Sequence, residues 1–163
     1  ENVFDLFETG KISESNFRDA IRMYSDKNLS DREIDSAWNA MIIELPEQRV
    51  EFLKKLKQNH RLFLLSNTNS IHEREFTCKI ISAYGKNILE ELFERIYYSH
   101  QVGLKKPREE IFQKILDENN LNPSNTLFID DSPQHIEGAR KIGLNVYLLK
   151  PEEAIDNALP NTE

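Results

Sequence analysis

Features of exported and membrane-bound proteins are scarce in this sequence of 163 residues. Cys78 is the only cysteine, so no disulfide can form within the chain, and a lone cysteine is usually an inert core residue. No apolar stretch approaches the roughly 18 residues of a membrane span, and the segment from Glu1 to Asp5 is acidic where a signal peptide is basic. These absences exclude a disulfide scaffold and predict a cytoplasmic protein that has no membrane partner.

Basic residues are also fewer than acidic residues. Lysine and arginine together number 21 against 28 aspartates and glutamates, which gives a net charge of -7. An acidic surface repels phosphate backbones and anionic lipids, so the composition argues against nucleic acid or membrane as a partner. The histidines lack the spacing of metal ligands, and we interpret all four as surface or supporting residues: His60, His72, His100 and His135.

The first 45 residues carry helix patterns only. Ser13 is placed to cap one helix, and Ser30 with Glu33 has the spacing of a capping box ahead of a second. Apolar residues follow each cap at helical intervals, namely Phe17, Ala20, Ile21 and Tyr24, then Ile34, Ala37, Trp38, Met41 and Ile42. We therefore predict that residues 1–45 form a small helical domain with Trp38 in its buried face.

Helices and short apolar strands begin to alternate at Pro46. Strands are predicted at 61–65, 95–99, 126–129 and 145–149, and helices at 47–58, 71–84 and 133–142, with a short amphipathic turn at 88–93. Pro107 is expected to open a further helix at its first position. Such alternation implies a parallel sheet with helices on its faces, so the fold class is α/β with a Rossmann-like core over residues 46–163. One helical turn is expected at 152–158, in the polar end of the chain.

Polar residues suited to phosphate chemistry follow two of the predicted strands and one loop. Ser66 offers a hydroxyl ahead of a helix, and Asp130 with Asp131 forms a carboxylate pair that can hold Mg²⁺. Lys106 lies before a proline, where its ammonium can neutralise a phosphate. Each feature also has a plainer interpretation as a polar turn, a helix cap or a solvated loop. Their joint placement at strand ends or beside them favours a phosphoryl-transfer site.

In this combination the chain resembles the haloacid dehalogenase superfamily of phosphatases. That family has a strand ending in Ser or Thr, a lysine before proline and an acidic pair after a strand, matched here by Ser66, by Lys106 and by Asp130 with Asp131. The sequence resembles most the bacterial sugar-phosphatase branch that includes glucose-1-phosphate phosphatases. The segments that carry this resemblance are Leu65-Ser66-Asn67-Thr68-Asn69 and Ile136-Glu137-Gly138-Ala139. The helical first 45 residues resemble the small cap of that branch.

The resemblance implies hydrolysis of a small phosphorylated metabolite in two steps. An aspartate attacks phosphorus to form an aspartyl phosphate, and water then releases the phosphate. Ser66 would orient the phosphoryl oxygens, Lys106 would offset their charge, and Asp131, supported by Asp130, would hold Mg²⁺. Asn67 and Asn69 are further candidates for contacting and selecting the substrate. These patterns predict neither the particular sugar nor the oligomeric state.

The sequence departs from the family at the first motif, which supplies the attacking aspartate, a second aspartate that acts as acid and base, and the first core strand. Because the chain opens within the cap, we expect this motif upstream, a core without its first strand, and no turnover by the chain alone. Asp5 is an alternative nucleophile if the segment around it is a strand, but Phe7 would then take the acid–base position. We prefer Asp5 as a polar residue on a cap helix.

Three other functions stay open as alternatives. A chain without the first motif suits a non-catalytic relative that binds phosphate or a partner protein. A haloacid dehalogenase is a nearer relative, although it does not need the acidic pair for a metal. A phosphorylatable receiver domain carries its acidic pair first and its lysine last, which is the reverse of the order here. For the phosphatase, we expect Ser66, Lys106 and Asp131 to meet in one cleft at the carboxyl edge of the sheet.

Overall fold

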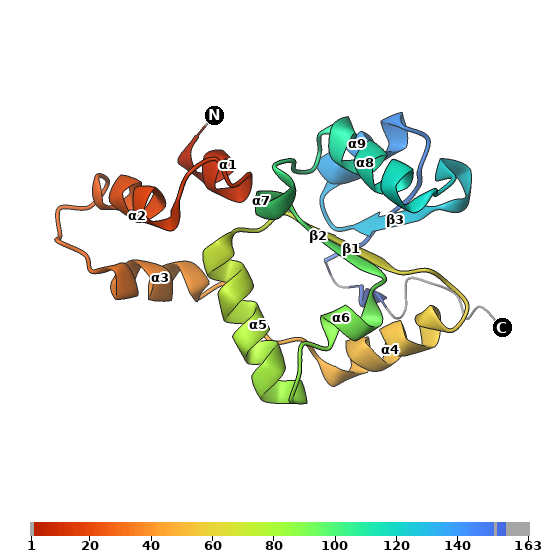
Figure 1. Cartoon of the computed structure of the whole chain (residues 1–163), viewed down its shortest axis with the longest axis horizontal. Helices are drawn as coiled ribbons and strands as arrows, with labels where there is room; N and C mark the ends of the chain where they lie inside the picture. Colours follow the sequence, from red (N-terminus) through yellow and green to blue (C-terminus); the bar gives the residue numbers. More distant parts are fainter. Residues whose placement is uncertain (1, 152, 156–163) are drawn as a thin grey trace. The chain divides into compact units, whose positions relative to one another are not determined.

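Helices and short parallel strands alternate along the computed structural model, which describes residues 2–151 and 153–155 (Figure 1). Contacts divide the chain into two units, Glu1–Gly103 and Leu104–Glu163. Each unit contains one two-stranded parallel sheet among its described residues. The predicted α/β class with parallel strands is therefore confirmed. The boundary at residue 45 between a helical domain and the core stays a prediction.

Three helices open the first unit: α1 (Val3–Glu8), α2 (Glu14–Arg22) and α3 (Asp31–Asn39). Ser13 caps α2, and Ser30 forms the expected capping box with Glu33 at the start of α3, because a side-chain oxygen satisfies amides that the first turn leaves unpaired. Asp5 lies in the first turn of α1, so the alternative that made it the end of a strand is wrong. The preferred interpretation, a polar residue on a helix, is confirmed.

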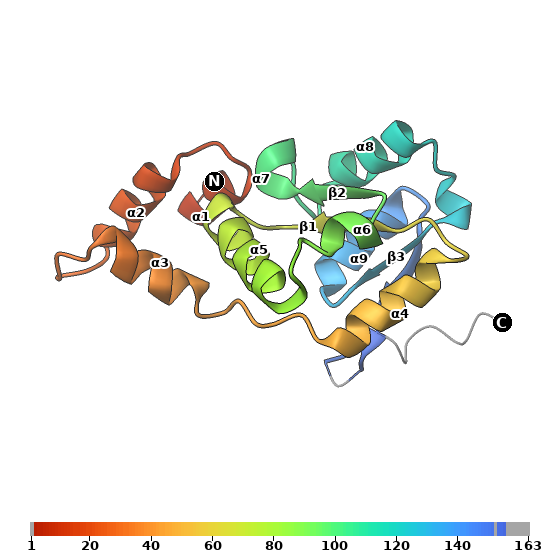
Figure 2. The same ribbon diagram turned by 60° about the horizontal axis from the view of Figure 1, so that its bottom comes forward.

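Aromatic side chains form the core under these three helices. Phe7 and Phe17 are buried and stack with ring centroids 4.3 Å apart, and Trp38 packs 5.0 Å from Phe17. Ile71, in the first turn of α5 (Ser70–Tyr84), joins the same cluster, and α3 lies beside that end of α5 in Figures 1 and 2. The predicted burial role of Trp38 is confirmed. Met41 is exposed because α3 ends two residues earlier, contrary to the expected apolar face.

An ion network ties α2 to α5. The Glu14 carboxylate accepts hydrogen bonds from Arg74 and Ser70 of α5 and from Arg18 of its own helix. Arg18 also donates to Asp35 of α3 at 2.7 Å. The hydrogen bond from Arg74 has the largest effect on the pKa of Glu14, which it lowers, whereas burial raises this pKa. The hydrogen bonds from Ser70 and Arg18 add to the effect of Arg74, and the pKa of Glu14 falls to about 2. The three helical segments are therefore held together by charge as well as by aromatic packing.

The strands β1 (Phe63–Ser66) and β2 (Arg95–Tyr98) pair in parallel, with Ser66 opposite Tyr98. Leu64 of β1 and Ile96 of β2 pack against a buried apolar cluster that α4 (Glu47–Lys57), α5 and α6 (Leu89–Leu92) supply. A short helix, α7 (Ser99–Val102), follows β2 directly. Because β1 and β2 are parallel, their carboxyl ends lie next to each other at the same edge of the sheet.

The second unit contains α8 (Glu109–Asn119), a 3₁₀ turn η1 (Pro123–Asn125), β3 (Leu127–Asp130), α9 (Pro133–Lys141) and β4 (Asn145–Leu148). The strands pair in parallel, α9 packs on both of them, and α8 packs on α9. Pro107 does not open α8, contrary to prediction. It follows Lys106 through a cis peptide bond in a turn closed by the Arg108 amide on the Lys105 carbonyl, so the helix begins only at Glu109.

Two further expectations concern single segments. Cys78 is exposed, so the interpretation of it as a core residue is wrong. The helical turn predicted at 152–158 falls largely on residue 152 and residues 156–158, which lie outside the described residues. Within the described part of the chain, no helix is both long enough and apolar enough to cross a membrane.

Candidate functional site

Lys106 and Asp130 form a buried ion pair in the second unit. The Lys106 Nζ donates to Asp130 Oδ2 at 2.7 Å, and the two side chains are only 9% and 8% exposed. The Lys106 ammonium also lies 5.7 Å from the centroid of the Phe128 ring, a distance at which a cation is attracted to the ring face. A loop lysine and a strand-end carboxylate, 24 residues apart in sequence, are thus brought into direct contact.

The second oxygen of the Asp130 carboxylate has two donors of its own. Oδ1 accepts from the Ser132 backbone amide at 2.9 Å and pairs with His135 Nδ1 at 2.8 Å. Burial by itself raises the pKa of Asp130, but the charge and hydrogen bond of Lys106, with the Ser132 and His135 hydrogen bonds, lower it below its ordinary value. Asp130 is therefore held as an anion with both oxygens engaged.

Asp131 differs sharply from its neighbour, because it is exposed. The plainer interpretation of this segment was that a side chain caps the next helix. Ser132 does occupy the N-cap position of α9, but its side chain makes no capping hydrogen bond. An exposed carboxylate beside a buried, fully hydrogen-bonded one gives the turn after β3 two carboxylates with different roles. Asp130 organises the turn, and Asp131 is open to a ligand.

Close packing between α9 and the Lys106 loop positions this pair. A Cβ built on Gly138 of α9 would lie 2.2 Å from the Pro107 carbonyl oxygen and 3.2 Å from the Phe112 ring. Phe112 in turn packs edge-on against Phe128 of β3, with centroids 5.0 Å apart. The absence of a side chain at Gly138 therefore lets the turn that carries Lys106 approach α9.

Ser66 and Asn67 lie in the first unit, at the carboxyl end of β1. Ser66 borders a cavity of about 260 Å³ whose lining is mostly apolar and includes Leu64, Phe76 and Tyr98. Burial, followed by the nearby negative charges of Glu73 and Glu90, raises the pKa of Tyr98 to about 12, so its hydroxyl stays protonated at neutral pH. Sequence reasoning missed Tyr98, whose only signal was its place at the end of the neighbouring predicted strand.

Asn69 and His72 have structural partners. Asn69 is 1% exposed, and its Oδ1 accepts from the His72 amide at 3.0 Å, which makes it the N-cap of α5. The His72 ring stacks on Trp38 at 5.0 Å, and its Nε2 lies 3.0 Å from the Trp38 carbonyl. His72 is buried, so of the two interpretations of it, a surface or a supporting residue, the surface one is wrong, and Asn69 is occupied by capping.

The predicted site residues fall into two groups. Ser66 and Asn67 belong to the unit Glu1–Gly103, and Lys106, Asp130 and Asp131 belong to the unit Leu104–Glu163. The structure brings Lys106 and Asp130 into contact, and the meeting of the two groups in one cleft stays a prediction. His135, interpreted from the sequence as a surface or supporting residue, is a partner of Asp130.

The chemistry of the turn after β3 suits Mg²⁺, which takes one or two carboxylates and fills its other positions with water and phosphate oxygens. Asp131 can supply a direct ligand, and Asp130 can support it. Among residues 2–151 and 153–155 there is no cluster of three or more His, Cys, Asp or Glu side chains placed to hold a metal.

Comparisons with known proteins agree with these features. A family model described as "Haloacid dehalogenase-like hydrolase" matches residues 6–149. The D-ribitol-5-phosphate phosphatase of Bacteroides thetaiotaomicron is 29% identical over 154 residues, which cover 94% of this chain and 73% of that protein. A crystal structure of the HAD family enzyme BT-2542 from the same organism matches with a TM-score of 0.86 and 34% identity, over 94% of this chain and 75% of that one. A structure of the wild-type BT-2542 protein in complex with magnesium and inorganic phosphate matches with a TM-score of 0.83 and 32% identity, over 95% of this chain and 78% of that one.

Proposed function

Because the chain belongs to the haloacid dehalogenase-like hydrolase family, we propose that it acts as a Mg²⁺-dependent phosphatase on the phosphate monoesters of sugars or sugar alcohols. The observation that carries the proposal is the buried Lys106–Asp130 pair beside the exposed Asp131. A similar protein named for D-ribitol 5-phosphate supports the substrate class, and the magnesium and phosphate bound to a similar enzyme support the cation.

Each proposed site residue has a role that follows from its surroundings. Asp131 is the proposed direct ligand of Mg²⁺, and Asp130 fixes the turn that carries it. Bound Mg²⁺ would supply positive charge to offset the phosphoryl oxygens. Lys106 is held by Asp130 with its ammonium in a fixed place, so it adds charge without needing to reorganise during the reaction. Ser66 would donate its hydroxyl to a phosphoryl oxygen, with Asn67 beside it at the substrate.

We assign no residue of the chain to the attack on phosphorus. The resemblance implies one aspartate as nucleophile and another two positions later as acid and base, and the sequence contains no two aspartates at that spacing. Asp5 lies on α1, and Phe7 stands two positions after it. The 163-residue chain alone is therefore expected to be inactive.

Phosphate release from D-ribitol 5-phosphate and glucose 1-phosphate tests the proposal, with the natural gene product and the 163-residue chain assayed in parallel. The natural product should hydrolyse at least one ester, a chelator should abolish the activity, and Mg²⁺ should restore it. Asp131→Asn should lower kcat about 100-fold or more, because it removes a metal ligand. Asp117→Asn, an equal change on the exposed surface of α8, is the matched control and should leave kcat unchanged.

Three results would contradict the proposal. A natural product that binds phosphate but hydrolyses no ester would favour the non-catalytic relative. Release of halide from a haloacid without Mg²⁺ would favour the dehalogenase. Robust Mg²⁺-dependent turnover by the verified 163-residue chain would place the nucleophile within it, and Asp5→Asn would then be the first substitution to make.

A further inference from the structure

Ser99 is a fully buried side chain outside the predicted site that bonds to the loop after Ser66. It is 0% exposed, and its Oγ accepts a hydrogen bond from the Thr68 amide at 2.9 Å while donating one to the Thr68 carbonyl at 2.9 Å. One hydroxyl thus satisfies both backbone polar groups of a residue that is itself only 5% exposed. Buried backbone groups need such partners, and here a side chain supplies them both.

The position of these bonds explains why a side chain is required. The register of β1 and β2 ends with Ser66 opposite Tyr98, and Ser99 is the next residue of the second strand. At Ser99 the chain turns into α7, so its backbone no longer runs alongside β1. The Ser99 hydroxyl replaces the missing backbone ladder with two bonds to Thr68, which lies two residues beyond Ser66, the last paired residue of β1.

The far end of the same loop is also fixed. Asn69 is 1% exposed and caps α5 through its side chain, so the segment after Ser66 is held by Ser99 at Thr68 and by the helix at Asn69. Ser66 is the last paired residue of β1, and only Asn67 separates it from Thr68. A change in the position of Thr68 would therefore move the backbone that orients the Ser66 hydroxyl.

We propose that Ser99 is a positioning residue for Ser66, which it keeps in place through Thr68 without touching the substrate. This rests on the proposed function, in which Ser66 orients the phosphoryl oxygens. Such a group has to be held tightly, because a misplacement of about 1 Å at a reacting centre can cost roughly 100-fold in rate.

The test compares Ser99→Thr with Ser99→Val in the natural gene product. The two replacements have nearly the same volume, but only threonine keeps the hydroxyl. Ser99→Val should lower kcat for a sugar phosphate about 10- to 100-fold relative to Ser99→Thr, and it should abolish protection of the Thr68 amide against hydrogen exchange. Ser99→Ala, which adds no volume, should behave like the valine variant if the larger side chains do not fold.

Ser82→Ala, which removes an exposed hydroxyl from α5, is the control and should leave both kcat and Thr68 exchange unchanged. Equal kcat values for the threonine and valine variants would overturn the positioning role, as would a Thr68 amide that stays protected in the valine variant. If the wild-type protein hydrolyses no phosphate ester, the proposed function itself fails, which is a different result from an active enzyme that is indifferent to Ser99.

Discussion

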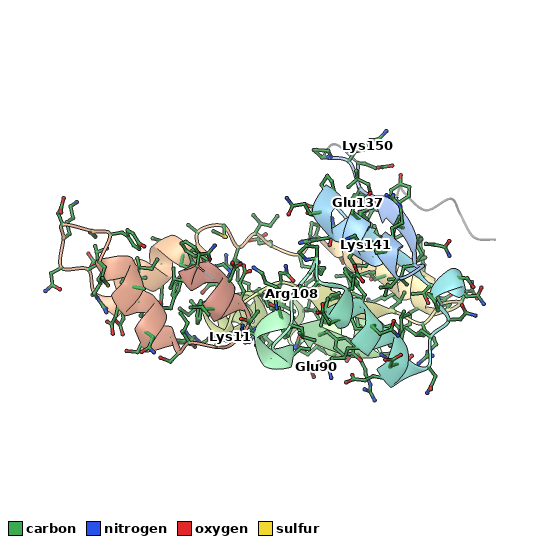
Figure 3. All side chains as sticks on the ribbon, turned by 90° about the horizontal axis from the view of Figure 1, so that it is seen from above. Lys11, Glu90, Arg108, Glu137, Lys141 and Lys150 are labelled. Atoms are coloured by element: carbon green, nitrogen blue, oxygen red, sulfur yellow. The ribbon has the colours of Figure 1, made fainter. Side chains whose placement is uncertain are left out.

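Replacement of Gly138 by alanine should destabilise the protein, although alanine is normally the better residue in a helix. Gly138 lies in the middle of α9 on its buried side, whereas its neighbours on the helix, Glu137 and Lys141, labelled in Figure 3, have side chains that are 62% and 65% exposed. An added Cβ would lie 2.2 Å from the Pro107 carbonyl oxygen and 3.0 Å from its carbon. Both atoms belong to the backbone, so no flexible side chain can turn away to make room.

The size of the effect is the difference between two opposing terms. Alanine gains about 1 kcal/mol over glycine within a helix. Overpacking that forces a backbone shift costs about 1–3 kcal/mol, and a contact this short lies at the upper end of that range. The net loss should therefore be about 2 kcal/mol, which corresponds to a fall in Tm of roughly 4–8 °C for a chain of this length.

Thermal and urea unfolding of Gly138→Ala beside the wild type measure this loss, with Gln134→Ala on the exposed side of the same helix as the control. The control should stay within about 0.5 kcal/mol of the wild type. Because the shift displaces the turn that carries Lys106, the proposed phosphatase activity of the natural gene product should fall as well when it carries this change. A Gly138→Ala protein that is as stable as the wild type, or more so, would refute the reasoning from close approach.

Three further predictions concern other parts of the structure. Lys106→Met should lower the unfolding free energy by about 3 kcal/mol, because it leaves Asp130 buried without its cation. Adding Asp130→Asn should recover part of that loss. Strictly additive effects of the two substitutions in urea unfolding would contradict the pairing. The low pKa of Glu14 stabilises the first unit above pH 4.5, so stability should fall as the pH drops from 4.5 towards 2, and E14Q should flatten this part of the pH profile. Gly10→Ala should lower Tm, because Gly10 has φ +66° and a Cβ there would lie 2.2 Å from a backbone oxygen of α7; an unchanged Tm would show that the segment can move aside.

Local patterns in the sequence were sufficient for most of the secondary structure. The caps at Ser13 and Ser30 were predicted because capping depends on residues three positions apart, and the helices and strands were placed to within a few residues from their apolar periodicity. The parallel direction of the strands followed from their alternation with helices. Pro107 was misplaced, because it lies in a turn closed by the Arg108 amide on the Lys105 carbonyl, and apolar periodicity does not encode such a bond.

The candidate residues themselves were also present in the sequence. Ser66, Lys106, Asp130 and Asp131 stand at strand ends or in a loop, where polar residues after apolar runs are visible without coordinates of any kind. Their number, type and order were enough to indicate phosphate chemistry. The pattern by itself does not distinguish Asp130 from Asp131, since adjacent residues of the same type differ only in their surroundings, and only the family resemblance gave Asp131 the metal.

Tertiary structure alone decided what those residues contact. It buries Asp130 against Lys106 and His135 and leaves Asp131 exposed, and it uses Ser99 to hold the backbone of Thr68. These contacts join residues 5 to 31 positions apart, so they exist only once the chain is folded and no local periodicity encodes them. Burial then separates the two carboxylates physically, because a desolvated anion must be paired, whereas an exposed one remains open to a ligand.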